Sequence, residues 1–283
     1  MKPLRLAFLL TAMAGLLSAC NTTTDIDVMS QEPQRPNIVF IMTDDHAFQA
    51  IGAYGSVLNE TPNIDRLAQE GMRFDRAYVS NSICSPSRAA LLTGRLPVRI
   101  GVAKGVFFEW SAKGLPQEEV TLAEVLKEAG YKTGIVGKWH LGHREGYLPK
   151  NHGFDSYYGI PYSNDMRVDP EMAVSKDVVF REGMTLEKMR DTQNKTRNWV
   201  PLVQGEEVIE YPTDQTTLTK RYTEQVLKFI EKNKKEPFFL YYAQSFPHVP
   251  LFASDAFLGT SRRGLYGDVV EELDDSVGQI LDK

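Results

Sequence analysis

Short apolar runs alternate with segments of helical periodicity along most of the chain. Continuous apolar runs of this length, rich in β-branched and aromatic residues, indicate strands that are buried on both faces. The predicted strands are residues 38–42, 72–79, 131–136 and 238–243. The predicted helices are residues 62–70, 85–93, 122–129, 222–236 and 266–281. Strands that alternate with helices predict an α/β fold, in which a largely parallel sheet is flanked by helices.

Two of these helices carry clear signals at their ends. Thr61 precedes Pro62, and Gly71 follows the last apolar position, as expected for an N-cap, a first helical residue and a helix stop. Thr121 and Glu124 have the spacing of a capping box. The boundaries of both helices are therefore predicted from side-chain chemistry as well as from periodicity.

The segment 167–214 is polar and only weakly periodic. We expect surface loops there, with one small hairpin around Val203–Ile209. No other regular element is predicted across these residues.

The beginning of the chain has the pattern of an export signal. Lys2 and Arg5 precede an apolar run over residues 6–17, which is too short to span a membrane comfortably. Leu17–Cys20 resembles the lipobox of bacterial lipoproteins, in which the cysteine becomes the lipidated first residue of the mature chain. The alternative is a plain secretory signal with an incidental cysteine.

The lipobox divides the chain into three parts. We expect residues 1–20 to be a lipoprotein signal peptide, residues 21–36 a polar tether, and residues 37–283 the folded body. A lipid on Cys20 would make the membrane a partner of an exported bacterial lipoprotein. Asn21 after the lipidated cysteine resembles a signal for sorting to the outer membrane, so the body would face the periplasm or lie at the cell surface.

Composition and charge narrow the possible partners. The 283 residues are 42% hydrophobic and 24% charged, which is ordinary for a globular domain. The net charge of −5 and the absence of a basic run argue against nucleic acid as a partner. The chain has two cysteines, and if Cys20 is lipidated then Cys84 has no disulfide partner.

Polar residues follow three of the predicted strands. Asp44 and Asp45 follow the first, Lys138 and His140 the third, and His248 the last. Ligands of parallel sheets collect at the carboxyl ends of the strands, so we expect these side chains near one another. Adjacent carboxylates favour a nearby positive charge, and a hard divalent cation such as calcium or magnesium suits oxygen ligands. The alternative for the two aspartates is a solvated turn.

Cys84 precedes the helix that Ser85 and Pro86 open. A helix N-terminus offers free N–H groups and the positive end of the helix dipole, which suits an anionic ligand. Arg88 lies one turn further on and faces the same way. The alternative is that Cys84 is a small buried residue with no chemical role.

The residues Cys84–Arg88, with sequence CSPSR, are followed by AALLTGR. This stretch resembles the signature of the type I, formylglycine-dependent, arylsulfatase-like sulfatase family. The resemblance implies that a maturation enzyme oxidises Cys84 to formylglycine, an aldehyde that hydrates. One hydroxyl of the hydrate would attack the sulfur of a sulfate ester, and the second would expel inorganic sulfate.

Further segments carry the same resemblance. Lys138 and His140, in GKWHLG, resemble residues that contact the aldehyde hydrate and the sulfate. In this comparison Lys138 binds sulfate oxygens and His140 transfers a proton. His248, in FPHVP, resembles the histidine placed against the ester, where it protonates the departing alcohol, and Ser163 resembles a residue of the sulfate pocket. Lysine and histidine residues of this kind are more often structural when they stand alone.

The resemblance also implies a metal site and a fold. Asp44, Asp45 and the modified Cys84 would bind the cation, with Arg88 among the catalytic residues. Lys138, Ser163 and His248 would bind the substrate, and the fold would be alkaline-phosphatase-like. The cation would be calcium in the first place, with magnesium as the alternative.

The resemblance begins near Asn37 and continues to the end of the sequence. Family members go on to a strand that ends in an Asp-Asn or Asp-His pair, and later supply another lysine. Neither occurs here, and Asp274 and Asp275 lie inside a helical pattern, so we expect an incomplete, N-terminal part of the catalytic domain. Two alternatives stay open: a phosphodiesterase or phosphonate hydrolase of the same superfamily, and a catalytically dead binding protein. The alcohol of the ester could be aryl, steroid or carbohydrate.

Overall fold

The computed structural model describes residues 35–193 and 196–283. The predicted signal peptide, most of the predicted tether and the predicted lipidation site at Cys20 therefore lie outside the described residues. No helix in the described part of the chain combines the length and the apolar character needed to cross a membrane.

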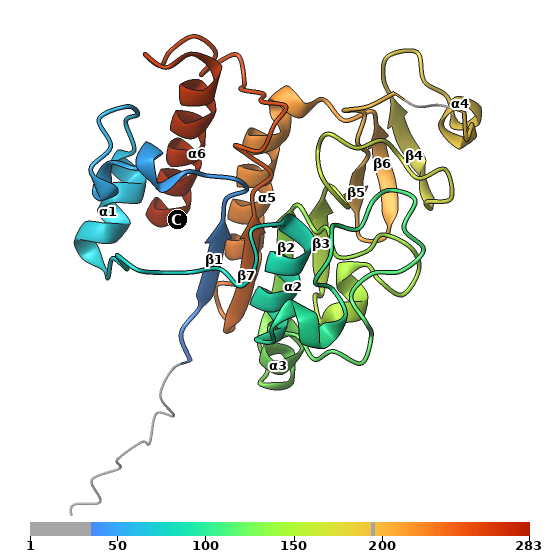
Figure 1. Ribbon diagram of the computed structural model, residues 1–283, viewed down its shortest axis with the longest axis horizontal. Helices are drawn as coiled ribbons and strands as arrows, with labels where there is room; N and C mark the ends of the chain where they lie inside the picture. The colour runs from blue at the N-terminus through green and yellow to red at the C-terminus, as the bar shows by residue number, and fades with distance from the viewer. Residues whose placement is uncertain (1–34, 194–195) are drawn as a thin grey trace, which may run out of the picture. The chain divides into compact units, whose positions relative to one another are not determined.

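A seven-stranded sheet forms the centre of the fold (Figure 1), with the strand order β1-β7-β2-β3-β5-β6-β4. The pairs β1–β7, β7–β2, β2–β3 and β4–β6 are parallel, whereas β3–β5 and β5–β6 are antiparallel. The strands are β1 (Ile38–Met42), β2 (Lys132–Gly137), β3 (Ser156–Gly159), β4 (Val174–Phe180), β5 (Leu202–Gln204), β6 (Glu207–Tyr211) and β7 (Phe238–Ala243). The expectation of a largely parallel α/β sheet flanked by helices is thus confirmed.

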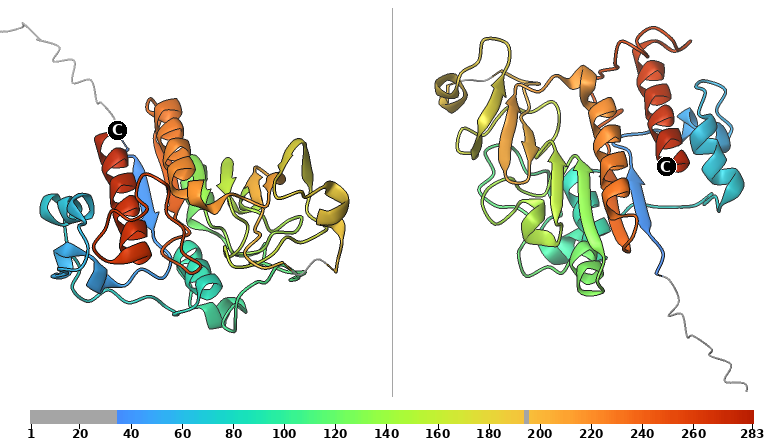
Figure 2. Two further views of the ribbon diagram at one scale, coloured as in Figure 1. Left: turned by 90° about the horizontal axis from the view of Figure 1, so that it is seen from above. Right: turned by 180° about the vertical axis from the view of Figure 1, so that it is seen from behind.

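Helices cover both faces of this sheet. Figure 2 shows α5 and α6 on one side and α2 on the other, and α5 packs on β2, β3 and β7. The helices are α1 (Pro62–Glu70), α2 (Cys84–Thr93), α3 (Leu122–Glu128), α4 (Leu186–Arg190), α5 (Leu218–Asn233) and α6 (Gly264–Asp282). Single 3-10 turns lie at Phe48–Ala50, Gly52–Tyr54, Pro97–Ile100, Pro149–His152 and Gln215–Thr217. Every residue of the central strand β7 is buried, which explains its uninterrupted apolar sequence.

The capping box of α3 forms as predicted. Thr121 accepts a hydrogen bond from the backbone N–H of Glu124, and the Glu124 carboxylate accepts one from the backbone N–H of Thr121. The expected side-chain cap of α1 by Thr61 is wrong, because Thr61 binds Gly52 and Asp65 instead. The carboxylate of Asp274 takes over the capping of α1.

Asp274 belongs to α6 and is buried. Its carboxylate accepts hydrogen bonds from the backbone N–H groups of Asn63 at 3.1 Å and Ile64 at 2.8 Å. A negative charge at the first turn of a helix satisfies free N–H groups and interacts favourably with the helix dipole. Asp274 therefore joins α6 to α1.

The strand expected at 72–79 is wrong. This segment joins α1 to α2 without any strand pairing, and it leaves Met72, Phe74, Tyr78 and Val79 exposed. An apolar run forms a strand only where it finds a partner for its backbone groups, and none of the described strands pairs with it.

The segment 167–214 contains more structure than expected. The hairpin around Val203–Ile209 is present as β5 and β6, but β4 and α4 were not predicted. Lys176 and Asp177 interrupt the apolar pattern of β4, which lies at the edge of the sheet, where one row of backbone groups has no neighbouring strand. β3, a strand of four residues with Tyr157 buried, was also missed because so short a run gives little periodicity.

Candidate functional site

The candidate site lies where β1, β2 and β7 end and where α2 begins. Asp44 follows β1, Lys138 follows β2, and His248 belongs to the segment after β7. Cys84 is the first residue of α2. Because all three strands run parallel, their carboxyl ends meet at one edge of the sheet and bring these side chains together.

Gly137 makes the exit from β2 possible. It has φ of 113°, and a side-chain Cβ there would lie 1.9 Å from the carbonyl oxygen of Ala243 in β7. Only glycine tolerates both conditions. The next residue, Lys138, donates its backbone N–H to the same Ala243 oxygen at 2.6 Å, which fixes where its side chain starts.

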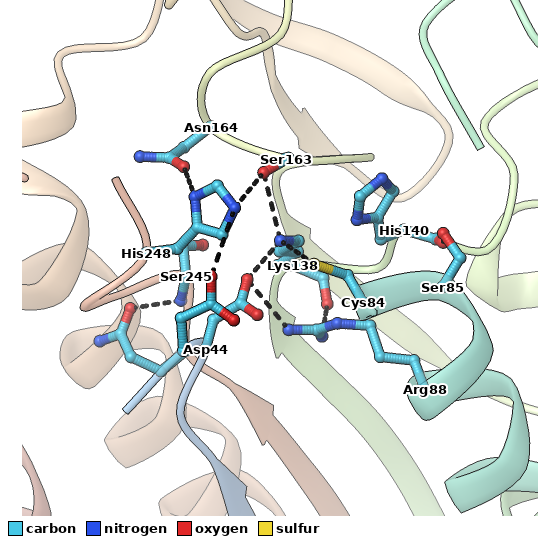
Figure 3. A network of polar contacts seen from close by, with 12 residues as sticks. Asp44, Cys84, Ser85, Arg88, Lys138, His140, Ser163, Asn164, Ser245 and His248 are labelled. Carbon is cyan, nitrogen blue, oxygen red and sulfur yellow. Dashed lines mark hydrogen bonds and ion pairs between the residues drawn. The ribbon is translucent and has the colours of Figure 1, made fainter. Parts of the chain in front are cut away.

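The Lys138 ammonium group lies at the centre of the site (Figure 3). It is fully buried and forms an ion pair with the Asp44 carboxylate. It also donates to the Ser163 hydroxyl at 3.2 Å and lies 3.5 Å from the Cys84 sulfur. Lys138 has three N–H donors, so these three contacts account for all of them.

Arg88 and Lys138 both neutralise Asp44. The Arg88 Nη2 atom lies 3.6 Å from the Asp44 carboxylate, and Nη1 donates to the backbone oxygen of Lys138 at 2.6 Å. Burial raises the pKa of Asp44, but the charges of Lys138 and Arg88 outweigh burial, so the pKa lies below its ordinary value. Asp44 is therefore a buried carboxylate held in its charged form.

Cys84 carries a free thiol, which is partly buried. The Cys84 sulfur and the Asp44 carboxylate lie close together, because the Lys138 ammonium group contacts both. Burial raises the pKa of the Cys84 thiol, although the charge of Lys138 opposes that shift. The unmodified thiol is therefore a poor nucleophile at neutral pH.

His248 is held by two residues of the segment after β3. Its Nδ1 atom pairs with the Asn164 side-chain oxygen at 3.0 Å, and its Nε2 atom lies 3.3 Å from the Ser163 hydroxyl. Asn164 itself donates to the Gln215 side chain and to the carbonyl oxygen of Pro250, which fixes its amide. The Asn164 oxygen accepts the Nδ1 proton and leaves Nε2 facing the site (Figure 3).

His140 lies on the other flank of Cys84. Its Nε2 atom donates to the carbonyl oxygen of Phe107 at 3.1 Å. Ser85 joins the same group, since its hydroxyl donates to the His140 carbonyl oxygen at 2.8 Å and accepts from the Phe107 N–H at 3.1 Å. Burial, together with the charges of Lys138 and Arg88, lowers the pKa of His140 well below its ordinary value, so the ring is neutral.

The two aspartates differ in their surroundings. Asp44 is buried, whereas the Asp45 side chain is 60% exposed and its carboxylate lies 3.8 Å from the Nε2 atom of His248. Both offer the hard oxygen atoms that calcium and magnesium prefer. Within residues 35–193 and 196–283, however, no group of three or more His, Cys, Asp or Glu side chains is placed to hold a metal ion. Two carboxylates fit such an ion as part of a ligand set, not as a complete one.

Two contributors to the site were missed in the sequence. Asn164 follows Ser163 directly, but its contact with His248 joins residues 84 positions apart. The backbone of Phe107 belongs to a loop without periodicity, and it contacts both Ser85 and His140. Nothing in the local sequence marks either contact, because both depend on how distant segments fold together.

Comparison with known proteins gives a consistent picture. A family model described as Sulfatase matches residues 36–283. N-acetylgalactosamine-6-sulfatase from Sus scrofa is 42% identical over 262 residues, which cover 88% of this chain and 47% of the relative. Arylsulfatase G from Homo sapiens is 41% identical over 256 residues, with 88% of this chain and 48% of the relative covered.

Solved structures agree with these relatives. The crystal structure of Ps i-CgsB matches with a TM-score of 0.74 and 32% sequence identity, and the match covers 88% of this chain and 55% of that one. The chain spans about half the length of the curated relatives that it matches. The family generally uses a divalent cation and a formylglycine residue. The family model and these similarities show that the chain belongs to the sulfatase family.

Proposed function

We propose that the protein hydrolyses organic sulfate esters to an alcohol and inorganic sulfate. The observation that carries this proposal is the position of Cys84, at the N-terminal end of α2 and 3.5 Å from the Lys138 ammonium group. Asp44 and His248 complete the polar surroundings. A helix N-terminus and a buried ammonium group together suit the oxygens of a sulfate group.

Cys84 would first be converted to formylglycine by a maturation enzyme. The hydrated formylglycine would supply one hydroxyl that attacks sulfur and a second that releases sulfate. The thiol has a raised pKa and is partly buried, so it is unsuited to act as the nucleophile itself. This difference explains why a modification at position 84 is needed for turnover.

Lys138 would bind the sulfate oxygens. Its contacts with Asp44 and Ser163 fix the ammonium group before substrate enters, and the N–H that points to the Cys84 sulfur would turn to the sulfate. Preorganised positive charge in a buried site stabilises negative charge that develops during reaction. Arg88 would act indirectly, since it binds the Lys138 backbone and Asp44.

His248 would protonate the departing alcohol oxygen. Its Nδ1 side is held by Asn164, and its Nε2 side faces Ser163 and Asp45. His140 would position the reaction centre, because its neutral ring and its carbonyl oxygen hold the Phe107 loop and Ser85. This differs from the expectation that His140 transfers a proton, which a strongly lowered pKa disfavours.

A divalent cation, calcium in the first place and magnesium as the alternative, would complete the site. Asp44, Asp45 and the modified residue 84 would supply part of its oxygen ligands, and the cation would offset charge on the sulfate oxygens. These residues would form only part of the ligand set, because the described residues contain no group of three or more His, Cys, Asp or Glu side chains placed to hold a metal ion.

Within sulfate esters, we propose a sulfated carbohydrate as the substrate class. N-acetylgalactosamine-6-sulfatase is among the similar relatives, and a further structure of Ps i-CgsB, at 32% identity and a TM-score of 0.72, contains k-i-k-neocarrahexaose. The name of the first contains a sugar, and the second is a complex with an oligosaccharide. Phosphodiesters and phosphonates are the rival substrates, and no particular feature of this site favours them.

The test uses the full chain, produced in cells with and without a formylglycine-generating enzyme. Mass spectrometry of the peptide that spans residue 84 reports the aldehyde, and release of inorganic sulfate from an aryl sulfate reports turnover. We expect the aldehyde only with the enzyme, and a Cys84→Ser variant should give at most a single turnover. An untouched thiol in cells that contain the enzyme would contradict the proposal.

Two further measurements distinguish a sulfatase from a phosphodiesterase and from a catalytically dead binding protein. An aryl phosphate diester turned over faster than the aryl sulfate would favour a phosphodiesterase. Binding of a sulfate ester that is indifferent to added calcium, without any turnover, would favour a dead binding protein. For substitutions of Lys138, Lys132→Ala is a matched control, because Lys132 is an exposed lysine at the start of β2, the strand that Lys138 directly follows.

We also propose that the protein is exported and held by a lipid on Cys20. The support is the sequence pattern of residues 1–20 alone. Metabolic labelling with a radioactive fatty acid, with Cys20→Ser as the control, tests it. Label on the unchanged chain and none on the variant is the expected result, whereas an unlabelled, freely released chain would contradict the anchor.

A further inference from the structure

Two buried side-chain amides support His248 from the side of its Nδ1 atom. Asn164 is fully buried, and Gln215 is 4% exposed. The Asn164 side-chain oxygen lies 3.0 Å from the His248 Nδ1 atom, and its amide nitrogen donates to the side-chain oxygen of Gln215 at 3.1 Å. Figure 3 shows Asn164 and Ser163 against the two nitrogens of the imidazole ring.

Backbone carbonyl oxygens, which can only accept hydrogen bonds, settle the orientation of both amides. The Asn164 amide nitrogen lies 3.0 Å from the carbonyl oxygen of Pro250. The Gln215 amide nitrogen lies 3.0 Å from the carbonyl oxygen of Asn164 and 2.9 Å from that of Asn198. A flipped amide would place oxygen against oxygen at each of these contacts. The side-chain oxygen of Asn164 therefore faces His248, and that of Gln215 faces Asn164.

The amide oxygen beside Nδ1 decides where the ring proton of His248 lies. This oxygen can only accept, so Nδ1 carries a proton in the neutral ring and in the charged ring alike. In the neutral ring Nε2 has a lone pair, and the Ser163 hydroxyl, 3.3 Å away, can donate to it. Lys138 donates to the same hydroxyl oxygen at 3.2 Å and so leaves the hydroxyl proton free for His248. Nε2 is therefore the ring atom at which His248 gains and loses a proton.

We propose that Asn164 and Gln215 are positioning residues that confine proton transfer by His248 to its Nε2 atom. This atom faces the candidate site, 3.8 Å from the Asp45 carboxylate. In the reaction, the charged ring gives its Nε2 proton to the alcohol oxygen as the S–O bond breaks. The electron pair of that bond stays on the alcohol oxygen, and the ring becomes neutral with its Nδ1 proton still on Asn164. This catalytic role rests on the proposed function, whereas the place of the Nδ1 proton does not.

The alternative is a purely structural role for the amide pair. Asn164 belongs to the segment after β3, and Gln215 begins the 3-10 turn before α5, so their contact also joins two separate parts of the chain. A structural role predicts that substitutions lower the free energy of unfolding but leave the ring proton of His248 in place. The position of that proton therefore distinguishes the two roles.

The first test is NMR of the full chain with ¹⁵N-labelled histidine rings at about pH 8.5, where ordinary histidines are neutral. The signals of His248 are those that a His248→Gln variant lacks. In the unchanged chain the Nδ1–H form should exceed the Nε2–H form by about tenfold or more, because an unpaired buried N–H is costly. Asn164→Leu should move the proton to Nε2, where Ser163 can accept it. Gln215→Met frees the Asn164 amide to flip and should populate both forms.

Asn233→Leu is the matched control. Asn233 is also a buried asparagine, and its amide also donates to a backbone carbonyl oxygen, that of Phe229 at 2.8 Å. It ends α5 ahead of β7, whereas His248 follows β7. The ring proton of His248 should therefore stay on Nδ1 in this variant.

The second test compares two substrates of the protein that carries formylglycine at residue 84. Phenyl sulfate releases a more basic oxygen than 4-nitrophenyl sulfate and so depends more on a proton donor. Asn164→Leu should lower kcat/KM for phenyl sulfate by about tenfold more than for 4-nitrophenyl sulfate. Asn233→Leu should affect the two substrates equally.

An Nε2–H ring in the unchanged chain would overturn the proposal without any variant. An Nδ1–H ring that persists in folded Asn164→Leu and Gln215→Met proteins would overturn it as well, and equal losses with both sulfates in Asn164→Leu would refute the catalytic role. These failures are distinguishable from failure of the proposed function. If residue 84 stays a thiol and neither sulfate is hydrolysed, the proposed function fails, but the NMR measurement still decides which nitrogen of His248 carries the proton.

Discussion

Replacement of Lys138 by methionine tests the electrostatic centre of the site. The substitution keeps an unbranched side chain of similar size but removes the buried charge that contacts Asp44. Asp44 would then keep one positive neighbour, Arg88, whose nearest nitrogen is 3.6 Å away. A buried carboxylate that loses its main partner destabilises the folded state, because it has lost water without full compensation.

The expected loss can be estimated from the structure. Removal of one partner of a buried ion pair costs about 3–5 kcal/mol, and the remaining Arg88 contact places Lys138→Met near the lower value of about 3 kcal/mol. For a domain of this size, each kcal/mol lowers the melting temperature by about 2–4 °C, so a fall of about 6–12 °C is expected. Lys132→Met is the control, since Lys132 pairs with Glu236 at 3.4 Å on the exposed surface and should lose at most about 1 kcal/mol.

Urea denaturation in a buffer with a metal chelator provides the measurement, because a free cation could otherwise replace the lost charge. A double-mutant cycle with Asp44→Asn isolates the pair: the two single losses should add to more than the loss in the double variant, with a coupling energy above about 1 kcal/mol. Equal stability of the Lys138→Met and Lys132→Met proteins, or simple additivity in the cycle, would refute this account of the site.

Three other predictions concern separate parts of the molecule. Asp274→Ala removes the cap of α1 and should lower the free energy of unfolding, measured with urea, by about 2 kcal/mol. Asp275 is an exposed neighbour, so Asp275→Ala should change this free energy by less than about 0.5 kcal/mol, and equal losses in the two variants would contradict the capping role. Burial raises the pKa of Asp169, but hydrogen bonds led by that from His143 bring it below its ordinary value. The charged carboxylate therefore stabilises the folded state above about pH 4, and this stabilisation is lost as the pH falls through the folded pKa. Asp169→Asn should reduce the fall in the free energy of unfolding between neutral and acidic pH. An unchanged pH dependence in the variant would contradict this role of Asp169. Without modification, Cys84 should be alkylated by iodoacetamide more slowly at neutral pH than in the urea-unfolded chain, because burial raises its pKa, and faster alkylation in the folded chain would contradict this.

The elements that the sequence pattern predicted are those with long, uninterrupted burial. β7 is buried at every position, and α5 and α6 each bury an apolar face along most of their length, so the apolar spacing alone indicated them. Residues 72–79 have the same kind of apolar content but lie outside the sheet, with Tyr78 89% exposed. Composition alone cannot distinguish a strand from a connection of this kind, because strand formation depends on a pairing partner supplied from elsewhere in the chain.

Single site residues were easier to predict than the contacts that orient them. Asp44, Lys138 and His248 follow strands and Cys84 begins a helix, and parallel strands bring such positions to one edge. The partners of these groups come from loops: Asn164 holds His248, and the backbone of Phe107 holds His140. A loop residue leaves no periodic signal, since its position is set by the elements on either side of it.

Residues at the strand ends and residues in the loops would also contact different parts of a substrate. The strand ends and the start of α2 place Lys138 against Cys84, and that geometry concerns the sulfate group, which every sulfate ester shares. The loop that follows α2 reaches the site through the backbone of Phe107, which contacts Ser85 and His140. Substitutions in the loop should therefore change which alcohol is accepted, whereas substitutions at the strand ends should affect all sulfate esters alike.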